Sequence, residues 1–292
     1  MSKKFILMTA AKNEEQYIGE AIKSVIQQTV HPVAWFIMDD GSTDRTADIV
    51  REYAAQYPFI RLNSAGERGG RNFGSQYKAI STAYEMARSL DFDFLAVQDA
   101  DIAPERSDYY ESLLRMFNEN DKLGIAGGYI YERAGEQWLS RKSNAKDSVA
   151  GGIQMFRRKC FEQIGGYTPL YLGGSDWLAQ LDAKIKGWQI SARSEFPVRH
   201  YRPTSTANGW RRGCLQLGAL DASFGTHPLF EIFKCVRRIP VKPFLIGAMF
   251  RFWGYWKWKL SNPGPLLPPD KVEFLRKEQM AKLARWFKLS SA

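Results

Sequence analysis

The sequence predicts an α/β fold, in which a mostly parallel, Rossmann-like sheet is flanked by helices, followed by a mainly helical extension that is basic and aromatic. Three observations lead to this prediction. Strand-like apolar runs alternate with helical patterns over the first third of the chain, and such alternation requires crossovers between parallel strands. Two of the runs end in paired carboxylates, at Asp39-Asp40 and at Asp99-Ala100-Asp101. The excess positive charge lies after residue 200, where the sequence has 16 Lys and Arg but only 5 Asp and Glu.

The central strand is predicted over residues 92–97, which are apolar and run into the second acidic pair. Open α/β sheets bind their ligands at the carboxyl ends of such buried strands. Asp99 and Asp101 lie on one side of an extended segment because side chains alternate, so both can face one cation. Carboxylates of this kind suit a hard divalent metal that carries a diphosphate. The alternative is an acidic turn with Asp101 near the start of a helix that Pro104 opens.

The elements before the central strand follow from apolar spacing. Asn13 is a favoured helix N-cap, and apolar residues from Ile18 to Ile26 repeat at helical intervals. Residues 10–14 carry no glycine fingerprint, which argues against a dinucleotide-binding dehydrogenase. The predicted strands are residues 5–9, 34–38 and 59–62. Three helices are predicted: one that begins after Asn13, one over residues 43–57, and one that begins after the glycine-rich loop 66–74 and ends at about residue 90.

The pattern beyond the central strand is less regular. The polar segment 132–147 is expected to form a mobile flap over the site. Residues 151–156 are expected to form a strand whose glycines, Gly151 and Gly152, permit close approach of a substrate. The other predicted elements are a helix over 104–118, a strand over 123–131, a helix over 160–164, a helix that opens at Asp176, and a β-type run that ends at His200.

The composition is that of an ordinary globular protein, with 45% hydrophobic and 25% charged residues. Cys160, Cys214 and Cys235 fit no metal-type spacing, so neither a disulfide framework nor a zinc site is expected, and a reducing cytosol is the expected compartment. The apolar start of the chain ends at Lys12, too early for a signal peptide. We find no uninterrupted run of about 18 apolar residues and therefore expect no membrane-spanning segment.

Four short motifs follow one another along the chain: Ala11-Lys12-Asn13-Glu14-Glu15, Asp39-Asp40-Gly41-Ser42, Arg71-Asn72-Phe73-Gly74 and Asp99-Ala100-Asp101. In order and spacing they resemble the nucleotide-binding half of family-2 glycosyltransferases. The resemblance extends over roughly residues 4–200. It implies a GT-A fold with a catalytic domain over 1–200, of which about 1–101 would bind the nucleotide sugar and 102–200 the acceptor.

The resemblance also implies roles in binding a nucleotide-diphosphate sugar, with a UDP-sugar favoured. A carboxylate can accept the imide N–H of uracil or a ribose hydroxyl, and an arginine can bind phosphate oxygens bidentately. Two alternatives remain open: Asp40 as a turn residue that caps the next helix, and Arg71 as a solvated loop charge. The implied contacts are Ala11, Glu14 and Asp40 at the base and ribose, Asp39 in support, Arg71 near the diphosphate, Asp99 at the donor sugar or ribose, and Asp101 at a divalent metal, Mn²⁺ or Mg²⁺.

Asp176 and the aromatic Trp177 resemble the catalytic base of family-2 enzymes and the residue that follows it. An inverting transfer needs such a base, because the acceptor hydroxyl must lose its proton as it attacks the anomeric carbon opposite the leaving diphosphate. Trp177 is expected on the acceptor side together with Gly151 and Gly152. The alternative is that Ser175 and Asp176 are helix N-caps.

His200 ends a β-type run at the expected end of the catalytic domain. Neutral imidazole is a common metal ligand. By resemblance to related glycosyltransferases, His200 would complete the metal site begun by Asp101, with Asp99 as a further candidate ligand. The alternative is a histidine packed at a strand end with one hydrogen bond.

Residues 201–292 interleave basic and aromatic side chains, a pattern typical of segments that bind an anionic membrane surface or nucleic acid. No known nucleic-acid-binding motif occurs, so no nucleic acid is expected as a partner. The alternative is a helical cover packed on the catalytic domain. A proline-rich link over 262–269 precedes a last amphipathic helix at 271–287. The residues expected at the membrane are Arg237, Arg238, Trp253, Trp256, Lys257, Trp258 and Lys259.

Segments 225–230, 252–255 and 274–279 more loosely resemble bacterial glycosyltransferases that build exopolysaccharide or O-antigen on lipid-linked acceptors. The Gln-x-x-Arg-Trp signature of processive synthases is absent, so one sugar per encounter is expected. We therefore expect a metal-dependent inverting glycosyltransferase that acts on a lipid-linked saccharide, peripheral on the cytoplasmic face of the cell membrane. Two alternative functions remain: a synthase that transfers a sugar directly to polyprenyl phosphate, and a non-catalytic module that binds membrane or nucleic acid.

Overall fold

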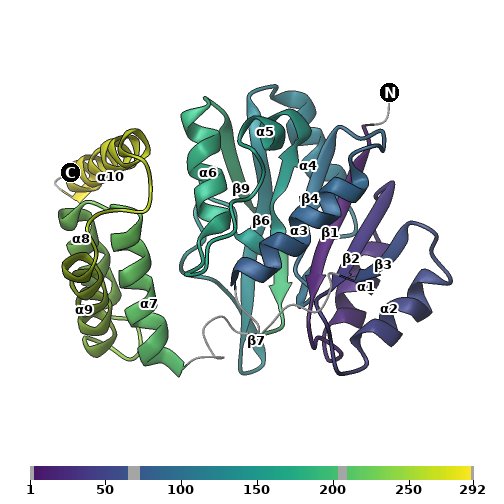
Figure 1. The fold of residues 1–292 in the computed structure, drawn as a ribbon, viewed down its shortest axis with the longest axis horizontal. Helices are drawn as coiled ribbons and strands as arrows, with labels where there is room; N and C mark the ends of the chain where they lie inside the picture. The colour runs from purple at the N-terminus through teal and green to yellow at the C-terminus, as the bar shows by residue number, and fades with distance from the viewer. Residues whose placement is uncertain (1–2, 65–72, 203–208, 291–292) are drawn as a thin grey trace. The chain divides into compact units, whose positions relative to one another are not determined.

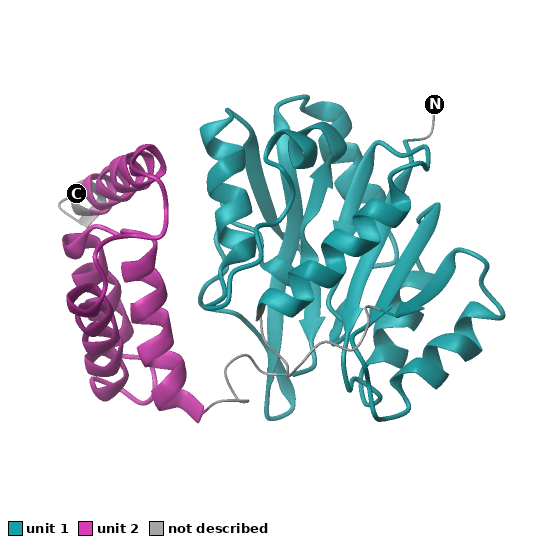
Figure 2. Cartoon of the chain, in the orientation of Figure 1, with its two compact units in different colours: residues 1–203 teal, residues 204–292 magenta. Residues whose placement is uncertain are grey.

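The computed structural model describes residues 3–64, 73–202 and 209–290, except for the side chains of residues 73 and 287–290. The chain forms two compact units, residues 1–203 and residues 204–292, which Figure 2 shows in teal and magenta. This division lies three residues after the boundary expected at residue 200. Each unit buries a set of apolar side chains of its own.

The strands of unit 1 follow the apolar runs of the sequence. In chain order they are β1 (Phe5–Ala11), β2 (Ala34–Asp39), β3 (Ile60–Ser64), β4 (Phe94–Val97), β5 (Ile102–Pro104), β6 (Leu123–Ala134), β7 (Gln137–Ser140), β8 (Met155–Arg157) and β9 (Gln189–His200). In the described residues they form one sheet with the order β3-β2-β1-β4-β8-β6-β9-β5, and β7 pairs with β6 (Figure 1). Strands β1, β2 and β4 are buried almost throughout, as expected of central strands in a sheet covered on both faces.

The direction of the strands changes in the middle of the sheet. Strands β1 to β4 form the predicted parallel part, in which β1 pairs with β2 and β4, and β2 pairs with β3. Strand β8 is antiparallel to both β4 and β6, and β5 is antiparallel to β9. The three-residue strand β8 therefore joins the parallel half to the second half.

Helices flank the sheet (Figure 1): α1 (Ile18–Ile26), α2 (Thr46–Ala54), α3 (Phe73–Ala87), α4 (Tyr109–Glu119), α5 (Arg158–Gln163) and α6 (Ser175–Ile185). Helix α1 shows why the apolar spacing predicts them, because Ile18, Ile22 and Val25 all turn toward the sheet and are buried. The core contains fully buried aromatic side chains, among them Trp35 and Phe94. The predicted α/β fold is confirmed.

One prediction in the second half of unit 1 is corrected by the structure. Residues 151–156 are not one strand: Gly151–Ile153 form a 3-10 turn, closed by the Ile153 N–H donating to the Ala150 carbonyl (3.1 Å), and β8 begins at Met155. The segment 132–147, expected as a flap, contains the hairpin between β6 and β7, in which Arg133 lies opposite Trp138.

Two predicted helix starts are also wrong. Asn13 does not cap α1, which begins at Ile18. Asn13 has a φ of +54°, and its Oδ1 accepts a hydrogen bond from the Thr43 N–H (2.8 Å), so it joins two loops instead. Pro104 opens no helix, because it lies in β5 opposite Val198 of β9, and α4 begins only at Tyr109.

Unit 2 is helical, as predicted, and consists of α7 (Gly209–Ser223), α8 (Pro228–Arg238), α9 (Ile246–Ser261) and α10 (Pro269–Ser290). Helices α7 and α9 pack closely where each presents a glycine. A Cβ on Gly218 would lie 1.9 Å from the Arg251 carbonyl oxygen, and one on Gly254 would lie 2.1 Å from the Leu215 carbonyl oxygen. Among the described residues, no helix is both long and apolar enough to cross a membrane.

Candidate active site

The carboxyl ends of β1 and β2 meet because the strands pair in register, with Ala11 opposite Asp39. One Asp39 oxygen accepts a hydrogen bond from the Ser42 N–H (3.1 Å), which fixes the turn after β2. Asp40 is only 5% exposed, and its Oδ2 lies 3.9 Å from Lys12 Nζ. Its buried Oδ1 has no hydrogen-bond partner among the described residues. Leaving such an oxygen unpaired is costly, so the site favours a ligand that donates a hydrogen bond there.

Arg202, just after β9, connects two buried carboxylates. Its guanidinium pairs with the Glu14 carboxylate, and its Nε lies 3.5 Å from Asp101 Oδ2. It also lies over the Tyr17 ring, 5.4 Å from the ring centroid, and Tyr17 stacks on Tyr201 at 6.2 Å. A cation between two buried anions offsets part of their desolvation cost. A ligand that brings its own positive charge to Asp101 would therefore compete with Arg202.

Asp101 and His200 come together through the pairing of β5 with β9, in which Ile102 lies opposite His200. His200 Nε2 lies 3.6 Å from Asp101 Oδ2, and its Nδ1 lies 3.3 Å from Glu132 Oε1. Burial alone would lower the pKa of His200, but its interactions with the Asp101 and Glu132 carboxylates outweigh burial and raise the pKa to about 9. The imidazole is therefore protonated at neutral pH when no cation is bound.

Asp101 and His200 offer a carboxylate oxygen and an imidazole nitrogen to a divalent cation. The described part of the chain holds no group of three or more His, Cys, Asp or Glu side chains arranged to bind a metal. Cations that serve nucleotide substrates commonly take only one or two carboxylates from the protein and complete their shell with phosphate oxygens and water. The pair therefore fits a metal ion that is shared with a diphosphate, and binding it would release the His200 proton.

Asp99 is partly buried beside the backbone of Gly152. Its N–H donates to the Gly152 carbonyl (3.0 Å), and its Oδ1 accepts a hydrogen bond from Gln76 Nε2 (2.7 Å). Burial, and next the charge of Asp101, raises the pKa of Asp99 to about 7. The bond to Gly152 fixes the backbone of Asp99 at the end of the central strand, and the bond from Gln76 orients its carboxylate.

Asp176 lies in the first turn of α6. The N-cap of this helix is Gly174, with a φ of +86°, and no side chain caps the helix. Ser175 Oγ instead accepts a hydrogen bond from the Leu170 N–H (3.0 Å), so the alternative in which Ser175 and Asp176 act as N-caps is wrong. Burial raises the pKa of the Asp176 carboxyl, which makes its carboxylate a stronger base.

Gly151 and Gly152, which we call the glycine seam, separate Asp99 from Asp176. A Cβ on Gly151 would lie 2.8 Å from both Asp176 Oδ2 and the Tyr77 hydroxyl oxygen, and one on Gly152 would lie 2.4 Å from Asp99 Oδ2. Only residues without a Cβ allow the backbone to pass between the two carboxylates at these distances. The seam thus sets how far apart Asp99 and Asp176 lie.

The remaining predicted residues occupy varied positions. Arg71 lies outside the described residues, and Trp177 is partly buried beside Asp176 in α6. Asp40 does not cap α2, because the N-cap of that helix is Arg45 and no side chain caps it. The seven residues expected at the membrane belong to unit 2. The predicted residues that the structure brings together at the edge of the sheet in unit 1 are Ala11, Glu14, Asp39, Asp40, Asp99, Asp101, Gly151, Gly152, Asp176 and His200.

Four side chains at the site were not predicted from the sequence. Arg202 follows His200 by two positions, so a cation just after the last strand was a usable signal. Glu132 lies in the segment expected as a flap. Gln76 and Tyr77 belong to the regular apolar pattern of α3, which gives no sign that they face two carboxylates.

Comparison with known families gives a match over residues 7–173 to the model described as glycosyl transferase family 2. Among curated proteins, the chain is 30% identical over 123 residues to the 4,4'-diaponeurosporenoate glycosyltransferase of Staphylococcus aureus (strain USA300). That match covers 42% of this chain and 30% of the relative, so the chain spans less than a third of that protein.

Several solved structures share the fold. The mannosyltransferase PcManGT from Pyrobaculum calidifontis, in complex with GDP-Man and Mn²⁺, matches with a TM-score of 0.58 at 17% identity, over 99% of this chain and 81% of that chain. S. aureus TarS 1-349 in complex with UDP-GlcNAc matches with a TM-score of 0.57 at 16% identity, over 85% and 73% of the two chains. GalNAc-T7 with UDP, GalNAc and Mn²⁺ matches with a TM-score of 0.59 at 14% identity, over 89% and 56% of the two chains. These likenesses show that unit 1 has the GT-A fold of sugar-nucleotide transferases.

Proposed function

Because the chain belongs to glycosyl transferase family 2, we propose that it transfers a single sugar, with inversion, from a nucleotide-diphosphate sugar to a lipid-linked saccharide. The observation that carries this proposal is the position of Asp99 and Asp176 on the two sides of the glycine seam, at the carboxyl edge of the sheet. An inverting transfer needs one group at the donor sugar and a base at the attacking hydroxyl, and Asp99 and Asp176 would take these two roles.

On the donor side, the unpaired Asp40 Oδ1 would accept a hydrogen bond from the nucleotide base or from a ribose hydroxyl. Glu14 would contact the base or ribose at the same edge of the sheet, with Asp39 in support. We propose a UDP-sugar as the donor, although the solved relatives carry both GDP-Man and UDP-GlcNAc. Arg202 would exchange its ion pairs with Glu14 and Asp101 for contacts with the bound donor.

Asp101 and His200 would hold a divalent cation, Mn²⁺ or Mg²⁺, which neutralises charge on the diphosphate leaving group. Two solved relatives contain Mn²⁺. Asp176 would take the proton of the acceptor hydroxyl as that oxygen attacks the anomeric carbon, and its raised pKa suits this role. Gly151, Gly152 and Trp177 would line the acceptor side.

A lipid-linked acceptor is supported by the relative named 4,4'-diaponeurosporenoate glycosyltransferase and by the charge of the extension. The 16 Lys and Arg against 5 Asp and Glu after residue 200 would attract unit 2 to the anionic cytoplasmic face of the cell membrane. The enzyme would then meet acceptors whose saccharide lies at that surface.

A thermal-shift screen of UDP- and GDP-sugars, each with and without Mn²⁺, tests the proposal. A ligand at about 100 times its dissociation constant adds about 2.7 kcal/mol of stability, and at least one nucleotide sugar should do so with Mn²⁺ present. Asp40→Ala should abolish the shift, because it removes the oxygen that would accept a hydrogen bond from the base or ribose. If no nucleotide sugar stabilises the wild-type protein, the proposed function is wrong.

The rival activity, transfer to polyprenyl phosphate, uses a nucleophile that carries no proton at neutral pH. Such an acceptor would need no general base. Activity that survives Asp176→Asn would therefore favour the rival, whereas its loss supports a hydroxyl acceptor.

A further inference from the structure

Helices α8 and α9 of unit 2 have the reverse of the usual arrangement of polar and apolar residues. On α8, Glu231 is only 1% exposed, whereas Ile232 and Val236 are 44% and 56% exposed. On α9, the Arg251 side chain is 11% exposed, whereas Trp253 is 64% exposed. In a water-soluble unit, charged residues are rarely buried and large apolar residues usually cover the core. The two helices therefore turn charge inward and apolar surface outward.

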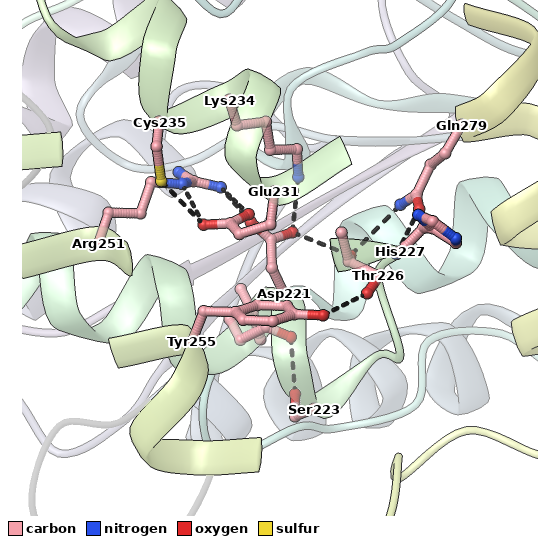
Figure 3. A network of polar contacts seen from close by, with 11 residues as sticks. Asp221, Ser223, Thr226, His227, Glu231, Lys234, Cys235, Arg251, Tyr255 and Gln279 are labelled. Atoms are coloured by element: carbon pink, nitrogen blue, oxygen red, sulfur yellow. Dashed lines mark hydrogen bonds and ion pairs between the residues drawn. The ribbon is translucent and has the colours of Figure 1, made fainter. Parts of the chain in front are cut away.

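The inward charges are satisfied by one another, as Figure 3 shows. Arg251 Nε lies 2.9 Å from Glu231 Oε1, and the Arg251 guanidinium also pairs with Asp221 of α7. Lys234 Nζ lies 2.7 Å from Asp221 Oδ1. These two carboxyl groups and two basic side chains link α7, α8 and α9 to one another, while large apolar side chains of α8 and α9 remain exposed.

The outward apolar side chains of α8 and α9 form a groove of about 640 Å³. We call this the α8–α9 face, and its main lining residues are Ile232, Val236, Ile239, Leu245, Met249 and Trp253. Phe244 and Ile246 beside it are also more than half exposed. An exposed apolar patch of this extent marks an interaction surface.

Three exposed cations are near the lining residues of this face along the chain. Arg237 follows Val236, Lys242 lies in the loop between α8 and α9, and Lys257 lies one turn beyond Trp253. An apolar surface bordered by Lys and Arg, with Trp beside them, is complementary to a bilayer interface that has anionic headgroups above hydrocarbon chains. A single soluble protein partner would have to match both features.

We propose that the α8–α9 face inserts into the interface of an anionic bilayer, with acyl chains against the groove and lipid phosphates against Arg237, Lys242 and Lys257. This inference rests on the proposed function, since it names the surface by which the enzyme reaches a lipid-linked acceptor. It also changes the expected set of membrane contacts. Arg238 is half-buried and donates to Cys214 Sγ (3.1 Å), and Trp256 and Trp258 are partly buried, so these three are not lipid contacts.

Vesicle sedimentation of the full chain tests the inference, with vesicles of phosphatidylcholine alone and of phosphatidylcholine mixed with phosphatidylglycerol. Wild-type protein should sediment with the mixed vesicles. The double variant Val236→Asp/Met249→Asp should bind them at least tenfold more weakly, because both changes place charge in the groove. The triple change Arg237→Gln/Lys242→Gln/Lys257→Gln should weaken binding by about a hundredfold, at about 1 kcal/mol for each cation, and should reduce its salt dependence.

A matched control is Leu217→Asp on α7, since Leu217 is 40% exposed and lies outside the groove. It should bind vesicles as wild type does. Donor stabilisation in the thermal-shift screen should be unchanged in all these variants, because their substitutions lie in unit 2. If the wild-type protein is stabilised by a donor but does not bind vesicles, this inference alone is wrong. If no donor stabilises the wild-type protein, the proposed function is wrong.

Three other results would also overturn the inference. The first is wild-type protein that stays in the supernatant with both kinds of vesicle. The second is self-association, measured by sedimentation velocity, that Val236→Asp/Met249→Asp abolishes, which would make a second copy of this chain the occupant. The third is saturable binding of monomeric decyl phosphate by a protein that does not bind vesicles, which would make the groove a site for one lipid chain.

Discussion

At the scale of single residues, Gly152 leaves no space for a methyl group beside Asp99. A Cβ there would lie 2.4 Å from Asp99 Oδ2, and the Gln76 hydrogen bond and the Gly152 carbonyl hold Asp99 in place. We expect Gly152→Ala to weaken donor binding by at least about tenfold and to destabilise unit 1 by about 1–3 kcal/mol through overpacking. Isothermal titration with a donor and urea unfolding measure the two effects.

The matched control is Gly19→Ala in α1, where an added Cβ meets no atom within 4 Å. Alanine favours a helix over glycine, so this variant should be at least as stable as wild type and should bind donor equally well. If Gly152→Ala behaved like Gly19→Ala, the glycine seam would not set the position of Asp99.

Asp176 and Asp182 lie on the same helix but should differ in their effect on turnover. Asp176→Asn should lower turnover by at least about a hundredfold while donor affinity stays near wild type, because a general base acts on the acceptor hydroxyl in the transition state. Asp182→Asn, six positions along α6, should change neither. Equal losses of donor affinity and turnover in Asp176→Asn would mean that Asp176 is structural.

At the scale of elements, the strands and helices that were predicted correctly are those with regular apolar spacing. Strand β4 and helix α1 are examples, since burial alone decides which of their residues turn inward. The predictions that were wrong involve residues with a local preference that tertiary contacts override. Asn13 prefers an N-cap in isolation, but its side chain bonds to the Thr43 N–H. Pro104 is favoured in a first helical turn, but proline is also tolerated in an edge strand, and here Pro104 is the last residue of β5 and pairs with Val198.

Local sequence patterns predict the site residues that follow directly from strands, but not the contacts between residues that are far apart in the sequence. Asp40 and Asp99 follow directly from apolar runs, so their edge of the sheet could be predicted from the sequence. The contact between Asp101 and His200 depends on pairing β5 with β9, across nearly a hundred residues, so it was expected from the family resemblance and not from a local pattern. The glycine seam was expected to admit a substrate, whereas its nearest neighbours are two carboxylates of the protein itself.

The buried charges between α8 and α9 predict how the stability of unit 2 depends on pH. Burial, and next the charge of Asp221, raises the pKa of Glu231 from 4.5 to about 7 despite the opposing effects of Arg251 and Lys234. Between these pH values the folded chain keeps a proton that the unfolded chain has released. The contribution of Glu231 to stability is therefore full below about pH 4.5 and falls as pH rises to about 7, by up to about 1.4 kcal/mol per pH unit.

Urea unfolding of wild type and Glu231→Gln across pH 5 to 7 measures this dependence. The variant carries no titrating group at this position, so its stability should fall less steeply. The Asp221 pKa is shifted in the opposite direction, to below 3.8, and Asp221 therefore does not titrate in the measured range. Parallel stability curves for the two proteins would contradict the raised pKa of Glu231.

At the scale of the whole molecule, the two units should respond to different changes. All the residues proposed to bind the donor lie in unit 1, while Arg251 joins buried carboxylates in unit 2. Donor with Mn²⁺ should raise the unfolding temperature of unit 1. Arg251→Met leaves Asp221 and Glu231 without their shared cation and should destabilise unit 2 by about 3–5 kcal/mol. Scanning calorimetry should resolve the two effects as shifts of separate transitions.

Lys277→Met is the control for Arg251→Met, because Lys277 pairs with Glu273 on the exposed surface of α10. It should leave both transitions where they are. If calorimetry shows a single transition whose midpoint temperature changes both with donor and with Arg251→Met, the two units unfold together.

The outward apolar residues of α8 and α9 have a practical consequence for the purified protein. The formal net charge of +10 makes molecules repel one another, and this repulsion keeps the exposed apolar surfaces of neighbouring molecules apart. Added salt shortens the reach of that repulsion to about 3 Å at 1 M, while the attraction between apolar surfaces remains. Light scattering of lipid-free protein should therefore increase with salt, and Val236→Asp/Met249→Asp should remain clear, so low-salt buffers should suit storage of the wild-type protein best.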